Sequence, residues 1–274
     1  MKKYFGSSLL RFCVYASAAF TGLVIVFLLG YILIKGLPHI TKDLFSWRYT
    51  SENVSVVPAL INTLIITLVS LLIACPLGIF SAIYLTEYSR KDNRFVKAVR
   101  LTTETLTGIP SIVYGLFGML LFVGQFKWGY SLLAGSCTIS IMILPVIMRT
   151  AEEALLAVPD SFREGSFGLG AGKLRTVFRI VLPSAVPGIL SGVILAIGRI
   201  AGETAALIYT AGTVASVPAN IMGSGRTLAI HMYVLSSEGL HTDQAYATSV
   251  ILMLIVIGIN SLAMFLAKKI GAKK

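Results

Sequence analysis

Long apolar runs without a single charge constrain this chain more than any other feature. The segments 12–34, 56–86, 105–126, 128–148 and 244–267 contain no Lys, Arg, Asp or Glu. A helix needs about 20 apolar residues to cross the hydrocarbon core of a bilayer, so each run is long enough to span. The composition agrees, because 56% of the residues are hydrophobic, only 13% are charged and the mean hydropathy is +0.84. These values exclude an ordinary soluble protein and predict an all-α integral membrane protein.

A sixth apolar run, 180–198, ends at two charges, Arg199 and Glu203. We expect this span to continue past the charged pair and to become loop-like over VASVPANIMGSG (214–225). The whole chain, 1–274, then forms a single transmembrane domain. Its six spans are predicted near 12–34, 57–86, 105–126, 129–149, 184–213 and 245–267.

The distribution of Lys and Arg predicts the orientation, since short cytoplasmic loops retain positive charge. Most of the 23 cations fall on the same side as both termini, which we therefore place in the cytoplasm. The net charge of +11 follows from this topology and requires no nucleic-acid partner. The other side receives Lys35, Lys42, Arg48, Lys127 and Arg226.

The sequence indicates neither catalysis nor a bound cofactor. The first run has no A-x-A site after it, which predicts a retained anchor and not a cleaved signal peptide. The three cysteines lie inside spans without C-x-x-C spacing, so small buried residues are favoured over metal ligands. GLGAGKLR (168–175) is similar to a phosphate-binding loop, but Phe167 and Leu174 stand where that motif needs Gly and Ser or Thr. We expect no ATP site in this chain.

The longest cytoplasmic loop, 150–183, has a pattern of its own. Ser161 and Glu164 stand at capping-box spacing after Pro159, and Gly170 can close a helix. The segment predicts an exposed helix of about two turns, followed by a basic amphipathic stretch. The alternative is an ordinary connector that lies on the lipid surface.

This loop resembles the permeases of ATP-binding-cassette importers. Their pattern is E-A-A, three residues, Gly, nine residues and I-x-L-P, and every spacing fits. Gly165 and Ser166 replace the two alanines, which keeps small residues there. The resemblance implies the type-I importer permease fold and a coupling helix seated on an ATPase subunit. The matching residues here are Glu164, Gly165, Ser166, Gly170, Ile180, Leu182 and Pro183.

Three further segments resemble the PstA-type permeases of phosphate importers: TGIPSIVYGLFG (107–118), LPVIMRTAEEALLAVPDSFREGS (144–166) and GRIAGETAAL (198–207). The sister PstC type stays an alternative, although the short N-terminus and modest outer loops look more like PstA. The resemblance implies phosphate import across a bacterial or archaeal plasma membrane. Its implied partners are a PstC-like permease, two PstB-like subunits that hold ATP and Mg²⁺, and an extracytoplasmic PstS-like phosphate-binding protein. A permease for another oxyanion or for phosphonate is the closest rival.

Arg199 and Glu203 are the charges that need an explanation within the spans. On a continuous helix they share one face, flanked by Gly198 and Gly202, which would let a neighbouring backbone approach. They either form a structural ion pair or belong to the substrate pathway. In the second interpretation, which the resemblance favours, Arg199 binds phosphate with its two-pronged guanidinium and Glu203 is a displaceable counter-ion. Uncharged polar residues within spans are expected to hydrogen bond within or between helices.

Overall fold

The computed structural model describes residues 2–90 and 93–271, and these residues form helices and loops without a strand. Three short segments, η3, η4 and η5, are π-helical and continue neighbouring α-helices. The elements are α1 (Lys2–Gly36), η1 (Leu37–His39), η2 (Asp43–Phe45), α2 (Val57–Ile83), η3 (Tyr84–Tyr88), α3 (Arg94–Thr107), α4 (Ser111–Gly118), η4 (Met119–Gln125), α5 (Leu132–Leu156), α6 (Asp160–Gly168), α7 (Lys173–Thr176), η5 (Val177–Val181), α8 (Leu182–Ala201), α9 (Ala205–Ile208), α10 (Leu228–Glu238) and α11 (Thr242–Gly271).

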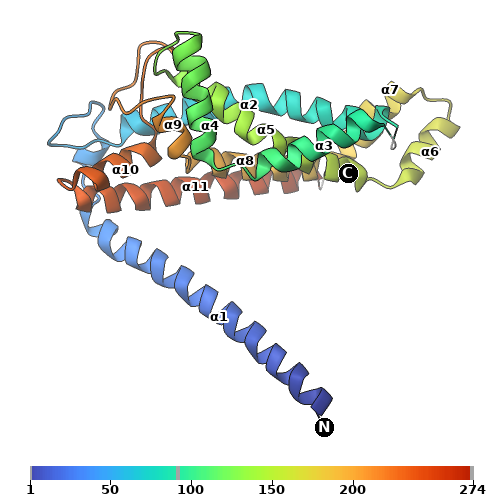
Figure 1. Cartoon of the computed structure of the whole chain (residues 1–274), viewed down its shortest axis with the longest axis horizontal. Coiled ribbons are helices and arrows are strands. Elements are labelled where there is room, and N and C mark those ends of the chain that lie inside the picture. The colour runs from blue at the N-terminus through green and yellow to red at the C-terminus, as the bar shows by residue number, and fades with distance from the viewer. Residues whose placement is uncertain (1, 91–92, 272–274) are drawn as a thin grey trace.

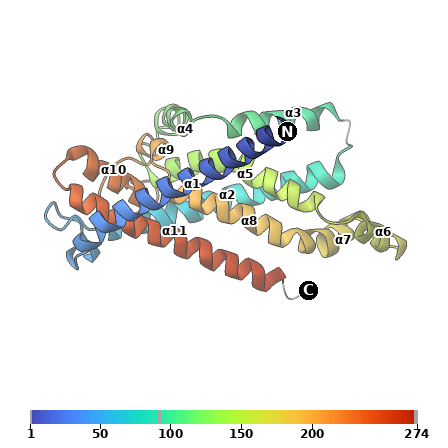
Figure 2. The ribbon, with the colours of Figure 1, turned by 90° about the horizontal axis from the view of Figure 1, so that it is seen from below.

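The core of the bundle lies where α2 packs along α5, with α8 and then α11 against them (Figures 1 and 2). Small residues permit this close approach: a Cβ on Gly78 would lie 2.9 Å from the side chain of Ile147. Hydroxyls add hydrogen bonds between the helices, because Ser70 donates to the carbonyl of Ser136 at 3.1 Å and Ser140 to that of Ser70 at 3.2 Å. The expected pairing of polar groups within the spans is confirmed at these positions.

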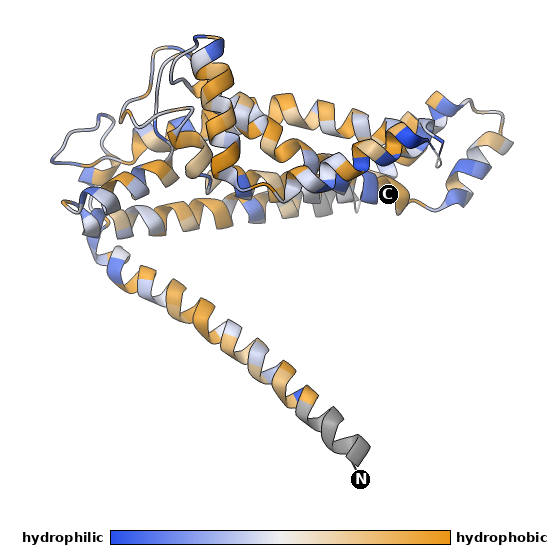
Figure 3. Cartoon of the chain, in the orientation of Figure 1, coloured by the Kyte–Doolittle hydropathy of each residue, from blue (hydrophilic) through white to orange (hydrophobic). Residues whose placement is uncertain are grey.

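The two ends of the bundle differ in character. Helices α6 and α7 project at one end, where Figure 3 colours several stretches of the ribbon as hydrophilic. The opposite end carries the segment 40–56, helix α10 and the long segment 209–227 (Figure 1). We call these the α6 end and the α10 end. By the distribution of Lys and Arg, the α6 end is the one expected in the cytoplasm.

The third span differs from the expected single helix over 105–126. Helix α3 ends at Thr107, α4 begins at Ser111, and the two helices are bent by 102° at the break. Pro110 explains the break, because proline lacks an N–H and disfavours α-conformation in the residue before it. If this bent pair counts as one span, the described residues contain six candidate spans, as the sequence predicts.

The fifth span also differs, since the expected helix over 184–213 stops early. Helix α8 ends at Ala201, and a four-residue helix, α9, follows after Gly202. Residues beyond Tyr209 form a loop that returns to the start of α5. Its carbonyls at Ile221 and Gly223 accept the N–H groups of Leu133 and Leu132 at 2.9 and 3.0 Å. The loop-like character expected for 214–225 is confirmed, and the loop satisfies donors that begin α5.

Helix α1 diverges from the bundle over most of its length (Figure 1). The apolar window of this span has no buried residue. The helix contacts the bundle near its C-terminal end, where the rings of Tyr31 and Tyr246 lie 5.9 Å apart and a Cβ on Gly36 would meet the backbone of Tyr246. An apolar helix exposed in this way needs lipid or another protein around it.

Candidate functional site: a coupling helix and a broken fifth span

Helix α6 is the short helix expected in the loop between the fourth and fifth spans. Gly170 ends it with φ of +81°, a conformation that glycine adopts without the penalty of a Cβ. The N–H groups of Gly170 and Ala171 donate to the carbonyls of Phe167 and Ser166 at 2.9 and 3.1 Å. This is the Schellman arrangement that closes many helices, so the predicted role of Gly170 in ending the helix is confirmed.

The expected capping box is wrong. The helix begins at Asp160 with Pro159 at the N-cap position, and no side chain caps it. Ser161 therefore lies inside the first turn, two residues past the N-cap position from which a side chain accepts the capping hydrogen bond. Pro159 itself fits its place, because a proline before the first turn loses no helical hydrogen bond.

The residues of the importer pattern do not all face one way. Ser166, Gly170 and Ile180 line a common cavity of about 320 Å³, and Leu182 packs against the buried residues near Val181. Glu164 and Gly165 are exposed, and a Cβ on Gly165 would meet no atom within 4 Å. Pro183 directly follows η5 within the continuous helix Lys173–Ala201, and its missing N–H removes one helical hydrogen bond there.

Helix α6 also presents an apolar surface that nothing in the described chain covers. Phe162, Phe167 and Leu169 are exposed, and Leu169 retains 91% of its accessible surface. These side chains lie at the α6 end, beyond the apolar spans. Exposed apolar residues on a short, well-closed helix are typical of a surface that meets another protein.

Arg163 ties α6 to the bundle. Its Nη2 donates to the Glu87 carboxylate at 2.6 Å and to the carbonyl of Leu155 at 3.0 Å. Its Nη1 donates to the carbonyl of Val158 at 2.8 Å and to the Asp160 carboxylate at 3.1 Å. The carboxylate of Glu87, 76 positions away in the sequence, belongs to η3 at the end of the second span. These bonds raise the pKa of the guanidinium, with the Glu87 hydrogen bond as the largest cause. One guanidinium thus joins α6, η3 and the C-terminal carbonyls of α5.

Arg199 lies in the last turn of α8, where the helix carbonyls favour a cation. It is partly buried and makes no hydrogen bond or ion pair with any other residue in the described ranges. Tyr114 of α4 is within electrostatic range of its guanidinium. Because α8 ends two residues later, Arg199 lies next to the break in the fifth span.

The level of this break is deep in the bundle and not at its surface. A Cβ on Gly198 would lie 3.6 Å from the Asn260 side chain of α11. Asn260 is roughly 27 Å along α11 from Thr242 at 1.5 Å per residue. The Oδ1 atom of Asn260 is buried without a hydrogen-bond partner in the described chain. The membrane depth of Arg199 stays a prediction, and its expected place in the middle of a helix is wrong, because α8 ends at Ala201.

Glu203 and Arg199 do not share a helix face, because α8 ends between them. Glu203 is 9% exposed, and its Oε1 accepts the N–H of Ala206 at 3.1 Å. The carboxylate thereby satisfies a donor at the start of α9, and within the described residues no ion pair joins it to Arg199. The expected Gly198 and Gly202 interface is also wrong: Gly198 faces a side chain, and Gly202 caps the end of α8.

Helix α9 is held in place by α4. A Cβ on Gly115 would lie 2.8 Å from Cα of Ala206, so the two backbones touch. A Cβ on Gly118 would collide with Thr138 and Thr210. The segment IPSIVYGLFG therefore supplies the surface on which the broken part of the fifth span rests.

Comparison with known proteins agrees with this architecture. The family model described as "Binding-protein-dependent transport system inner membrane component" matches residues 74–273, more than half of the chain. The chain belongs to this family. A permease of a bacterial alginate ABC transporter has the same fold, with a TM-score of 0.66 over 95% of this chain and 96% of that one, at 16% identity.

Two relatives narrow the assignment. The probable ABC transporter permease protein YqgI of Bacillus subtilis is 32% identical over 93% of each chain. The phosphate transport system permease protein PstA of Mycobacterium leprae is 33% identical, over 86% of this chain and 80% of its own. Within the family, the chain belongs to the PstA-type permeases.

Sequence reasoning missed two residues that the structure brings forward. Arg163 directly precedes the importer pattern, which begins at Glu164, but its partner Glu87 is too distant in sequence to be found without a fold. Arg226 was counted only as an outer cation, yet it is 4% exposed. The neighbouring Gly225 is the one available sign, because glycine often marks a close backbone approach. A Cβ at this position would lie 2.6 Å from Asn62 Nδ2.

Proposed function

We propose that this chain is the permease subunit through which an ATP-driven importer moves inorganic phosphate. The observation that carries the proposal is the combination of PstA-type relatives over most of the chain with the Arg199 guanidinium, which has no ion-pair partner in the described residues and lies beside the break in the fifth span. Hydrocarbon strongly disfavours an isolated anion, so a pathway for phosphate needs a fixed positive charge. Arginine provides one that stays protonated at any accessible pH.

Arg199 is the residue to which we assign the anion. Its planar guanidinium can donate two parallel hydrogen bonds to two phosphate oxygens. No carboxylate has to be displaced from Arg199 first, because Glu203 accepts the N–H of Ala206 instead. Glu203 then sets the position of α9 and adds a negative charge nearby that hastens release of the anion. The alternative structural role as an ion pair finds no support in the described contacts.

The second half of the proposal concerns coupling. The exposed apolar residues of α6 seat in a partner ATPase subunit, with Glu164, Gly165, Ser166 and Gly170 forming the helix and its turn. ATP and Mg²⁺ are held by that partner, and this chain binds neither. Nucleotide-driven movement of α6 then passes to η3 and α5 through Arg163.

The remaining parts of the assembly follow from this function. A single coupling helix and an uncovered α1 favour pairing with a second, PstC-like permease, two PstB-like ATPases and an external PstS-like binding protein. The α6 end faces the cytoplasm with both termini, and the α10 end faces the binding protein. The plasma membrane of a bacterium or an archaeon is the expected location.

Anion-stimulated ATP hydrolysis tests the substrate. The importer, reconstituted with its binding protein in liposomes, should hydrolyse ATP faster with phosphate than with sulfate, phosphonate or molybdate. Uptake of labelled phosphate into the liposomes should follow the same order. Stimulation by another oxyanion together with absence of phosphate uptake would overturn the assignment and favour the rival substrate.

A further inference from the structure

A buried guanidinium without an anionic partner lies at the α10 end, outside the site described above. Arg226 is 4% exposed, and its Nε and Nη2 atoms have no hydrogen-bond partner in the described chain. Within that same part of the chain, no carboxylate oxygen lies within 4 Å of it. A buried charge in this state is costly, and proteins retain one mainly where an anion uses it.

The backbone around Arg226 fixes this charge in place. Its N–H donates to the carbonyl of Val214 at 2.8 Å, and its carbonyl accepts the Nδ2 of Asn62 at 3.2 Å. Asn62 Nδ2 also donates to the carbonyl of Ser216 at 3.1 Å. One asparagine of α2 therefore anchors both Arg226 and the loop that passes over it.

Tyr49 contacts Arg226 and also lines a cavity. The Arg226 guanidinium carbon lies 4.6 Å from the centroid of the Tyr49 ring, within the range of a cation–π contact. The other neighbour of that ring, His231, carries no charge to compete, because burial and the nearby Arg226 lower its pKa to about 3. Arg226 thus lies one side chain away from the cavity, because Tyr49 contacts both.

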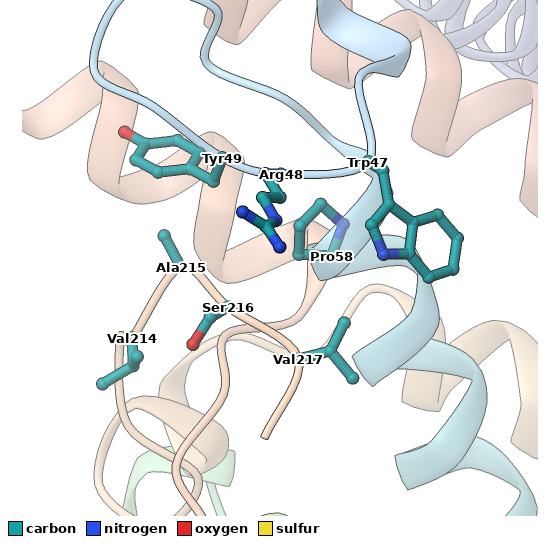
Figure 4. A pocket seen from close by; sticks show the side chains of 8 residues that line it. All are labelled: Trp47, Arg48, Tyr49, Pro58, Val214, Ala215, Ser216 and Val217. Carbon is teal, nitrogen blue, oxygen red and sulfur yellow. The ribbon is translucent and has the colours of Figure 1, made fainter. Parts of the chain in front are cut away.

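The cavity that Tyr49 lines is also lined by a second arginine, Arg48. It has a volume of about 500 Å³ and lies between the segments 47–49 and 214–217. In Figure 4 the guanidinium of Arg48 lies at the centre of the lining side chains, with Ser216 on the facing segment and Trp47 at one edge. No carboxylate is among the residues that line it.

We propose that this cavity, which we call the Arg48 pocket, is a binding site for a phosphate-like oxyanion at the α10 end. Arg48 supplies the two-pronged contact, Ser216 a hydroxyl donor, and Arg226 a buried positive charge that raises affinity without touching the anion. The site would receive the anion before it reaches Arg199. Its identification with inorganic phosphate rests on the proposed function, whereas the preference for an oxyanion rests on the charges alone.

Trp47 allows occupancy to be measured locally. The assembled importer, without its binding protein, is labelled with 5-fluorotryptophan in nanodiscs, and the Trp47 resonance is assigned with Trp47→Phe. Inorganic phosphate is then titrated at constant ionic strength with chloride as the balancing anion. We expect a saturable shift of the Trp47 resonance.

Three variants separate the roles. Arg48→Gln and Arg226→Met should each weaken phosphate binding at least tenfold. Lys42→Gln, which removes an exposed cation of the same end outside the pocket, should stay within twofold of the parent. Arg226→Met should also leave the midpoint of thermal unfolding unchanged or raised, because it removes an unpaired buried charge and keeps the packing volume.

Several results would overturn the inference. One is the absence of a saturable shift at phosphate concentrations that sustain uptake in the complete importer. Another is parental affinity in Arg226→Met, or a lower midpoint of unfolding, which would make the residue structural. A saturable response to a different oxyanion that the importer also transports would keep the pocket and refute only the phosphate assignment.

Discussion

At the scale of single residues, the buried carboxylate of Glu203 acts as a hydrogen-bond acceptor for the backbone. Its Oε1 accepts the N–H of Ala206, so Glu203→Gln keeps an acceptor while it removes the charge. We expect that variant to assemble normally and to transport more slowly, because the anion leaves Arg199 less readily. Glu203→Leu also removes the cap and should destabilise the protein by about 1 kcal/mol.

Thermal unfolding and phosphate uptake, both measured per assembled complex, separate the two effects. Equal uptake by Glu203→Gln and the parent would show that the charge has no part in transport. Equal stability of Glu203→Leu would show that the bond to Ala206 is unimportant.

Gly170 is the residue whose backbone conformation matters most for coupling. A side chain at φ of +81° costs about 1–2 kcal/mol, so Gly170→Ala should loosen the turn that ends α6. Gly172, with φ of −72°, provides the matched control, since Gly172→Ala introduces the same methyl group without that strain. Neither new Cβ meets an atom of this chain within 4 Å.

We expect the ratio of phosphate imported to ATP hydrolysed to fall in Gly170→Ala and to stay unchanged in Gly172→Ala. Gly170→Trp should lose uptake altogether while membrane insertion persists. Normal coupling in the tryptophan variant would reduce α6 to a connector.

His231 makes stability depend on pH. Burial, and next the nearby Arg226, lower its pKa to about 3, whereas an unfolded chain protonates near pH 6.5. Between these values the unfolded state binds the additional proton, so stability is intact above pH 6.5 and falls as the pH falls. At pH 5 the loss from this residue is about 2 kcal/mol.

The check is the midpoint of thermal unfolding at pH 7.5 and pH 5 in the parent and in His231→Phe. The acid shift should be smaller in the variant. An identical shift in both proteins would assign the acid sensitivity to other groups.

At the scale of elements, Arg163 hydrogen bonds α6 to both the second and the fourth span. Within the described chain, no other residue is found that joins α6 to both of these spans. Arg163→Met would leave Glu87, whose side chain is 8% exposed, without its partner, and should destabilise the complex by about 3–5 kcal/mol. The double variant Arg163→Met with Glu87→Leu avoids that unpaired charge. It should assemble and hydrolyse ATP, yet import less phosphate per ATP.

Arg94→Met is the matched control, because it removes an exposed cation at the same end of the molecule. Its ratio of phosphate to ATP should equal that of the parent. If the double variant also keeps the parental ratio, the movement of α6 reaches the spans by another route.

Sequence patterns predicted the existence of the elements better than their continuity. Uncharged length identified each span because the bilayer imposes it. The sequence predicts the third span as one helix that Pro110 could kink, but it does not predict a break, since prolines also occur in unbroken membrane helices. The end of α8 at Ala201 depends on Glu203 capping α9 and on α9 packing against Gly115, and such contacts are set by tertiary structure.

At the scale of the whole molecule, the chain is incomplete as a transport path. Its α1 is uncovered, and the apolar face of α6 has no partner in the described residues. Family resemblance predicted the fold from a few spaced residues, and the coupling role of α6 stays a prediction. The resemblance did not predict which side chains contact each other. The hydrogen bonds of Arg163 to Glu87 and the burial of Arg226 are therefore known only from the structure.

The central claim is that Arg199 carries phosphate through the membrane, and uptake per assembled complex tests it most directly. Arg199→Lys keeps the positive charge and loses the two-pronged hydrogen bonding of the guanidinium, whereas Arg199→Ala loses both. The account predicts normal assembly of both variants, no uptake by Arg199→Ala, and less than about a tenth of parental uptake by Arg199→Lys, a loss of more than 1.4 kcal/mol of transition-state stabilisation. Parental uptake by Arg199→Ala in a fully assembled importer would contradict it.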